Sequence, residues 1–133
     1  ETYAVKIGPL SGLCWIKAIG KDIETSVYGT ALKSEFEELN AKITKVYGTG
    51  DTTDMLLTGS IWNEPNDFMM ALRKNERLLF TVWENPKNLE KIVQVGLLAS
   101  ATGSDTGHVS LEYSFENKER AEQEISALED DVF

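Results

Sequence analysis

Few side chains in this sequence have the chemistry that enzymes use for proton transfer or nucleophilic attack. It contains one histidine, His108, and one cysteine, Cys14, among 133 residues. His108 lies on the polar side of an alternating stretch, and it would need a carboxylate or nucleophile placed beside it to act as a general acid or base. Cys14 lies in the apolar run LCWI, which is typical of a small buried thiol. The sequence therefore favours a protein that is not an enzyme.

Carboxylates that could bind a metal lie in the middle of the chain, at Asp51, Asp54, Glu64 and Asp67. Their spacing lacks the alternating oxygen ligands of a calcium loop, and one histidine with one cysteine cannot make a zinc site. The glycines form neither a dinucleotide-binding GxGxxG pattern nor a Walker loop. We therefore expect no metal and no other cofactor, and interpret these carboxylates as solvated loop residues.

An aromatic and methionine-rich stretch, SIWNEPNDFMMALRKNERLLFTVWEN, occupies residues 60–85. Its apolar spacing favours a place in the core for Trp62, Phe68, Met69, Leu72, Leu79 and Trp83. A binding groove is the alternative, because adjacent helical positions point about 100° apart and one of the two methionines, Met69 or Met70, could then face outward. An exposed methionine beside a tryptophan makes an adaptable contact surface.

The balance of charge is acidic. Twenty-two acidic residues against thirteen basic ones give a net charge of -9, which repels nucleic acid and anionic membranes and favours a basic protein partner. Carboxylates gather on two predicted helices, and such runs are also typical of a solvated face. The residues predicted to bind a partner are the glutamates of those helices with two apolar anchors: Glu35, Glu37, Glu38, Trp62, Met69, Glu122, Glu124 and Glu129.

The first half of the chain predicts a hairpin followed by a helix. TYAVKIG and LCWIKAIG alternate around a turn with Gly8-Pro9 and Gly12, and 21–29 could continue the second strand. Over residues 30–48 one apolar stripe runs along a helix, for which Thr30 is a candidate N-cap and Gly48 a candidate end. The stripe consists of Leu32, Phe36, Leu39, Ile43 and Val46.

The second half predicts more strands and a final helix. Residues 49–54 form a loop by composition, and Asn63 or Asn66 could cap a short helix that contains Pro65 and ends near residues 73–75. Strands are predicted at 77–84, 92–99 and 109–115, with turns at 85–88 and 101–107. Asn117 then caps a helix whose stripe is Ala121, Ile125, Leu128 and Val132.

These elements define the expected fold. The order is strand, strand, helix, short helix, three strands and a helix, with short connections and one-sided strands. That order predicts a single α+β domain over residues 1–133, with a mostly antiparallel sheet of about five strands and helices packed mainly on one face. Apolar stretches are all shorter than the roughly 20 residues that cross a bilayer.

YGTALKSEFEELNAKITKVYG, followed by GSIWNEPNDFMMAL, resembles segments of small acidic bacterial toxin-immunity proteins, over Tyr28 to Leu72. The resemblance implies a protein that binds and neutralises a cognate basic toxin, such as a nuclease. It favours the bacterial cytoplasm, while a first residue of Glu1 rather than Met leaves the periplasm or secretion open. Two alternatives stay open: a small-ligand-binding module with a pocket lined by Trp62, Met69 and Trp83, and a small enzyme that uses His108.

Overall fold

The fold is α+β, as the sequence predicts. The computed structural model describes residues 2–86 and 89–132, with side chains up to 129. Its elements are β1 (Thr2–Gly8), β2 (Gly12–Ile19), β3 (Ile23–Glu24), α1 (Thr30–Tyr47), β4 (Asp51–Leu56), the 3-10 turn η1 (Pro65–Asp67), α2 (Phe68–Arg73), β5 (Arg77–Glu84), β6 (Ile92–Ala101), β7 (Thr106–Phe115) and α3 (Lys118–Val132).

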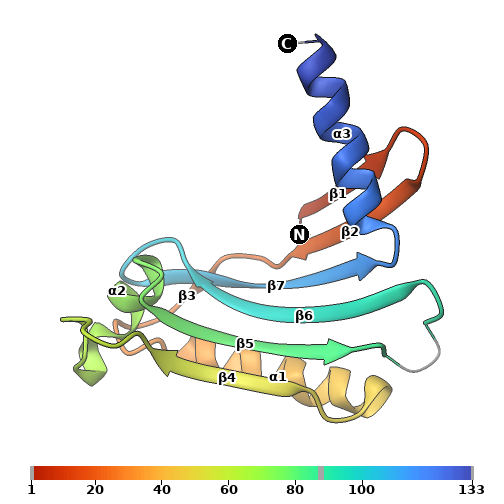
Figure 1. Cartoon of the computed structure of the whole chain (residues 1–133). Coiled ribbons are helices and arrows are strands. Elements are labelled where there is room, and N and C mark those ends of the chain that lie inside the picture. Colours follow the sequence, from red (N-terminus) through yellow and green to blue (C-terminus); the bar gives the residue numbers. More distant parts are fainter. Residues whose placement is uncertain (1, 87–88, 133) are drawn as a thin grey trace.

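The strands form one antiparallel sheet in the order β1-β2-β7-β6-β5-β4, and the short β3 pairs with the start of β7. The N-terminal hairpin therefore lies beside the last strand, and β1 and β4 are the edges (Figure 1). The sheet is larger than the five strands expected, partly because the predicted loop at 49–54 is wrong: Asp51–Leu56 is an edge strand. Its polar residues suit an edge, where Thr52 Oγ1 lies 2.8 Å from Thr81 Oγ1 of β5.

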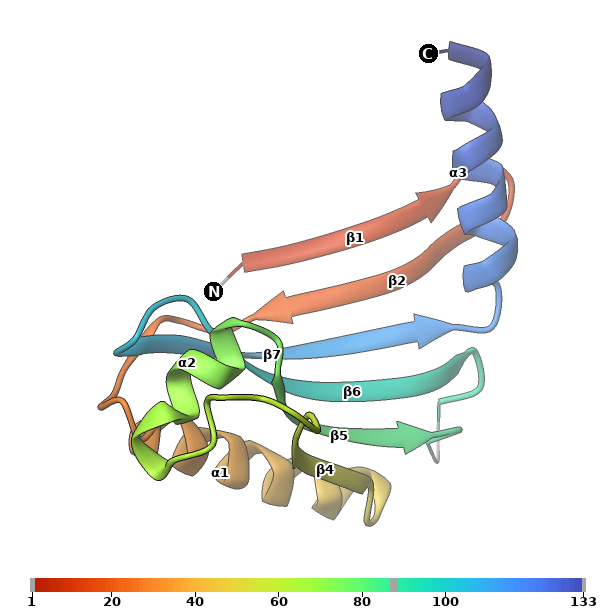
Figure 2. The same ribbon diagram turned by 60° about the vertical axis from the view of Figure 1, so that its left-hand side comes forward.

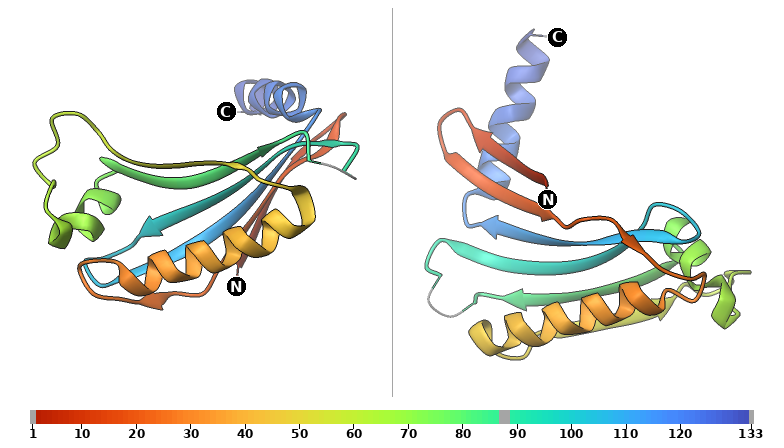
Figure 3. Two further views of the ribbon diagram at one scale, coloured as in Figure 1. Left: turned by 90° about the horizontal axis from the view of Figure 1, so that it is seen from below. Right: turned by 180° about the vertical axis from the view of Figure 1, so that it is seen from behind.

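The helices divide between the two faces of the sheet. Helix α1 contacts β6 and β7, and α2 contacts β5 and β6, so both lie on one face. Helix α3 contacts β1 and β2 from the opposite face, as Figure 3 shows in the view from below. The second half of α3 extends past the edge strand β1 (Figure 2), and Leu128 of its predicted stripe is 53% exposed there.

The main core lies between α1, α2 and the three strands β5, β6 and β7. Alternate strand residues face the helices, and they meet the predicted helix stripe at Leu32 and Phe36, which are buried. Leu39 and Ile43 are half-buried against this core, whereas Val46 is 63% exposed, so the predicted stripe is wrong at its last residue. The buried cluster also contains most of the aromatic stretch: Phe68, Met69, Leu72, Leu79 and Trp83.

Helix α1 is held at both ends by groups that differ in part from those predicted. Its N-cap is Gly29, at φ 69°, rather than Thr30, and the Ala31 amide donates to Thr25 Oγ1 at 3.0 Å. Gly29 has no room for a Cβ, which would lie 2.4 Å from the Phe68 ring. The predicted end at Gly48 is confirmed. Burial, together with a hydrogen bond to Tyr47 at that end, raises the pKa of Tyr113 on β7 to about 12.

The remaining local predictions differ in detail. The turn before α2 is capped by Glu64 in a reciprocal pair with Asp67, rather than by Asn63 or Asn66. Strands β6 and β7 extend into the predicted loop at 101–107, because backbone pairing continues to Ala101 and Gly107. The predicted turn at 85–88 lies partly outside the described residues.

We predict that replacing Phe36 by Ala lowers the free energy of unfolding by about 3–5 kcal/mol, because the substitution leaves a cavity in the main core. Val46→Ala on the same helix is the matched control, and its effect should stay within about 0.5 kcal/mol because Val46 is exposed. Urea denaturation of both variants measures the difference. Equal effects would contradict the placement of α1 on the sheet.

Candidate binding face

The acidic residues of α1 do not form a negative surface by themselves. The helix carries three lysines and three glutamates, so its side chains have no net charge. Glu37 and Glu38 are exposed on its outer side, where Glu38 forms an ion pair with Lys42 at 3.5 Å. Glu35 is half-buried, at the side of α1 that faces the N-terminal hairpin.

Helix α3 is the acidic element, with six carboxylates and two cations along its sequence. Two of these carboxylates bind the protein's own hairpin. Glu122 pairs with Lys6 at 3.2 Å, and Glu124 accepts hydrogen bonds from the amides of Leu10 and Ser11 and from Ser11 Oγ, at 3.1, 2.9 and 2.7 Å. Glu129 is exposed. The structure thus separates the two predicted acidic sets, because α1 and α3 lie on opposite faces (Figure 3).

Close packing fixes α3 against the hairpin. A Cβ on Gly8 would lie 2.6 Å from the Cβ of Ala121, so the helix contacts the strand at a residue without a side chain. One turn further on, the bonds from the Ser11 hydroxyl and amide lower the pKa of Glu124 below its ordinary value of 4.5. Glu124 is therefore a structural clamp on the hairpin turn.

The predicted apolar anchors lie mostly inside the protein. Met69 is 1% exposed, and Met70 and Trp62 are half-buried. Trp83 is 3% exposed and donates from Nε1 to the Gly48 carbonyl at 2.8 Å. Of the three side chains predicted to line a small-ligand pocket, Met69 and Trp83 thus pack in the core, whereas Trp62, also predicted as core, is not part of the buried cluster.

His108 lies on the face of the sheet away from α1, opposite Ser100 on β6. Among the described residues, none of the side-chain hydrogen bonds or ion pairs joins it to a carboxylate or a hydroxyl. Over the same residues, His, Cys, Asp and Glu side chains nowhere gather in a group of three that could hold a metal.

An apolar surface that the sequence analysis did not identify lies on the N-terminal hairpin. We call it the hairpin face: Tyr3, Val5 and Ile7 of β1 with Leu13 of β2. Pairing places it on the α1 side of the sheet, since Val5 is opposite Ile16, and Ile16 is opposite the core residue Tyr113. Its side chains are 67, 53, 60 and 38% exposed. On the same side of β6, Val95, Leu97 and Ala99 are at most 2% exposed.

A groove runs between the hairpin and the flank of α1, and we call it the α1 groove. Its floor contains an apolar hollow of about 210 Å³, lined by side chains of α1, β1, β2, β6 and β7: Leu39, Ile43, Tyr3, Ala18, Leu97 and Leu111.

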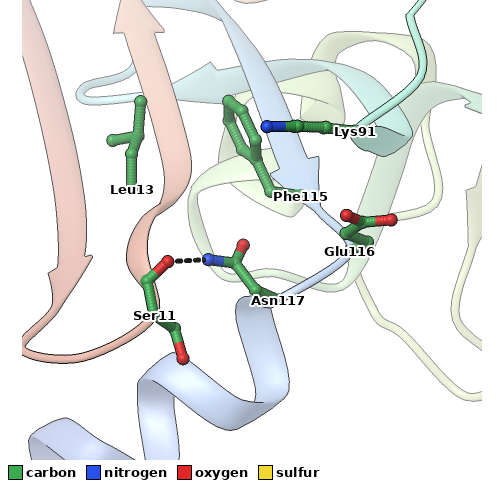
Figure 4. Close-up of a pocket in the computed structure, with 6 residues that line it drawn as sticks. All are labelled: Ser11, Leu13, Lys91, Phe115, Glu116 and Asn117. Carbon is green, nitrogen blue, oxygen red and sulfur yellow. Dashed lines mark hydrogen bonds between the residues drawn. The ribbon is translucent and has the colours of Figure 1, made fainter.

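A second hollow lies apart from the α1 groove and shares no lining residue with the apolar hollow. The apolar hollow of about 210 Å³ lies beside the middle of α1 and has no charged side chain in its lining. The hollow of about 380 Å³ lies at the turn of the hairpin, where Leu13 and Phe115 line it together with Lys91 and Glu116. Figure 4 shows this second hollow, which is closed below by the bond from Asn117 Nδ2 to the Ser11 carbonyl, at 2.7 Å.

A third hollow, of about 440 Å³, continues the groove toward β3. It shares Gly20, Leu39 and Val109 with the apolar hollow and adds Ile23, Glu35 and Lys21. The groove therefore changes along its length from apolar, beside Leu39 and Ile43, to charged, beside Glu35.

Comparison with known protein families, with curated proteins and with solved structures finds no match for this chain. Among the helices that the structure describes, none has the length and apolar character needed to span a membrane. The surface itself is therefore the basis for any proposal about function.

The hairpin face was missed because its sequence signal is the same as that of a buried strand. Tyr3, Val5 and Ile7 alternate with other residues, which predicts one apolar side but does not say whether a helix covers it. Whether a helix covers this apolar side depends on the position of the hairpin at the sheet edge. That position is known only from the strand order.

We predict that Glu124→Gln lowers stability at pH 7, because the charged acceptor on the hairpin turn is lost. A carboxylate whose pKa is lowered by folding stabilises the protein above its ordinary pKa of 4.5, and this contribution disappears as the pH falls through the folded value. The difference between wild type and variant should therefore shrink below pH 4.5. Denaturation at pH 7 and pH 3 measures it, with Glu129→Gln as the exposed control. A difference that is as large at pH 3 as at pH 7 would contradict the clamp.

Proposed function

We propose that this protein is a non-enzymatic binding protein that holds a basic protein partner on the hairpin face and in the α1 groove. The single observation that carries the proposal is the exposure of Val5 and Ile7, at 53 and 60%, on the face of the sheet where α1 and α2 bury the residues of β6. A contiguous exposed apolar patch on a small protein marks an interaction site more often than not.

The charge of the chain supports a basic partner. A net charge of -9 attracts cations over a long range and raises the rate of association. The apolar side chains of the hairpin face then act at short range, where buried contacts slow dissociation. The two features thus serve different stages of one binding event.

A toxin-neutralising role fits this combination. A nuclease active site is basic because it holds phosphates, so an acidic inhibitor gains both speed and specificity against it. An inhibitor of this kind needs no catalytic group of its own. We therefore propose an immunity protein of the bacterial cytoplasm as the particular form of this function.

The proposal predicts that the apolar contacts control the lifetime of the complex. We would co-purify the protein with the product of its neighbouring gene and measure the dissociation rate. Replacing Val5 and Ile7 together by Thr, which keeps the preference for a strand, should raise this rate roughly tenfold or more. Ile61→Thr is the matched control, because Ile61 is 75% exposed and lies outside the hairpin face. Equal rates for both variants would refute the assignment of this face.

Charge should control the rate of association instead. Raising the salt concentration from about 50 to about 500 mM should slow association several-fold, because the Debye length falls from about 14 Å to about 4 Å over this range. Replacing the exposed Glu37, Glu38 and Glu129 by Lys should slow it further without unfolding the protein. An association rate that changes neither with salt concentration nor with these substitutions would exclude a partner that is attracted by charge.

A further inference from the structure

We propose that the part of the partner that enters the α1 groove is an amphipathic helix of about four turns, which lies beside α1 on the hairpin face. This inference rests on the proposed function and specifies the element that the partner contributes. It is based on the width, length and lining of the uncovered surface.

The width of the uncovered surface fits one helix. A helix with its side chains is about 10 Å across, and two neighbouring strands occupy about the same width. In this protein α2 contacts β5 and β6, α3 contacts β1 and β2 from the opposite face, and α1 contacts β6, β7 and the two-residue strand β3. On the α1 side, the strands β1 and β2 are the pair that a further helix would cover.

The hollows beside α1 have the spacing of anchors on a helix. The apolar hollow is lined by Leu39 and Ile43, and the hollow next to it by Glu35 and Leu39. In each pair the two residues are four positions apart on α1. The two hollows are therefore displaced from each other by about one helical turn, or about 5.4 Å. Side chains three or four residues apart on a partner helix that runs alongside α1 would enter them in succession.

The length of the surface sets the length of the partner helix. It extends from Leu13, at the turn of the hairpin, to Gly20, where the third hollow begins. At about 3.3 Å per strand residue this is about 23 Å, which a helix covers with about 15 residues. Helix α1 itself runs along the strands on this side of the sheet (Figure 1), so a second helix can lie next to it.

The lining predicts the side chains of the partner. The apolar hollow, of about 210 Å³, is larger than the cavity of about 150 Å³ that binds benzene in another protein, so it accepts one large aliphatic or aromatic side chain. In the next hollow, Glu35 favours a lysine or arginine with its aliphatic stem on Ile23, although Lys21 lies at the rim. An apolar anchor followed one turn later by a cation matches a basic partner.

Two synthetic peptides test this inference directly. Both have 16 residues and the same content of leucine, lysine and glutamine. In one peptide leucine recurs every three or four residues, as on one face of a helix, and in the other it recurs at alternate positions, as in a strand. Fluorescence anisotropy measures the affinity of each for the whole chain, and circular dichroism follows helix formation on binding.

Substitutions in the protein locate the binding site. Ala18→Leu fills the apolar hollow, and it should weaken binding of the helical-period peptide at least tenfold. Ala4→Leu is the matched control on the opposite face of the hairpin, because Ala4 pairs with Lys17, and it should leave the affinity unchanged. If Ala18→Leu fails to fold, as judged by urea denaturation, the Val5→Thr and Ile7→Thr double variant takes its place.

Tight binding of the helical-period peptide alone, with a gain in helix and sensitivity to Ala18→Leu, is the expected result. Tighter binding of the alternating peptide would overturn the inference in favour of strand addition to β1. Equal binding of both peptides, insensitive to Ala18→Leu, would overturn the inference and show only a general attraction between opposite charges. If neither peptide binds, the inference is refuted. A dimer of the free chain that Ala18→Leu dissociates would assign the groove to a second copy.

The proposed function is tested separately from the form of the partner. If the neighbouring gene product binds and the hairpin-face variants weaken its complex, the proposed function stands even where the helical peptide fails. If no neighbouring product binds at all, the proposed function fails before the form of the partner is considered.

Discussion

A helix can shield only about two strands from water on one face of a sheet, because its diameter is about 10 Å and strands are about 4.8 Å apart. Six strands side by side therefore need about three helices on each face that is to be closed. The described part of this chain has two helices on one face and one on the other. Three helices cannot close both faces, so part of the sheet is exposed on each. On the α1 side the exposed part includes the N-terminal hairpin, and its side chains there are apolar.

The period of the apolar residues predicted the elements but not their surroundings. Leu32 and Phe36 were correctly placed in the core, because a stripe of period 3.6 has one side that must be buried. Val46 belongs to the same stripe, yet it is exposed near the end of α1, which the periodicity alone does not reveal. Strand β4 was missed because its polar composition resembles a loop, and its single partner strand is 20 or more residues away in sequence.

The predicted site residues show the same limit of sequence periodicity, which does not reveal the surroundings of a side chain. A run of carboxylates in a sequence does not reveal which of them are bound within the protein. Glu122 and Glu124 contact a hairpin that is more than 110 residues away, so their partners could not be inferred from spacing. Glu37, Glu38 and Glu129 stay exposed, in line with the ordinary behaviour of charged residues on helices. The aromatic stretch was correctly interpreted as core for Phe68, Met69 and Trp83, because burial of such residues is the usual outcome.

The position of the hairpin also has a consequence for the order in which the chain assembles. Strand β2 pairs with β7, and the hairpin turn is clamped by Glu124, so the hairpin is synthesised well before the elements that it contacts. Such distant pairings form slowly, because a long loop must close before the contacts are made. During synthesis the β2 edge of the hairpin lacks its neighbouring strand until β7 emerges, and unpaired edges are where aggregation begins. The N-terminal hairpin thus presents an unpaired edge during synthesis that it does not present in the finished sheet, namely that of β2.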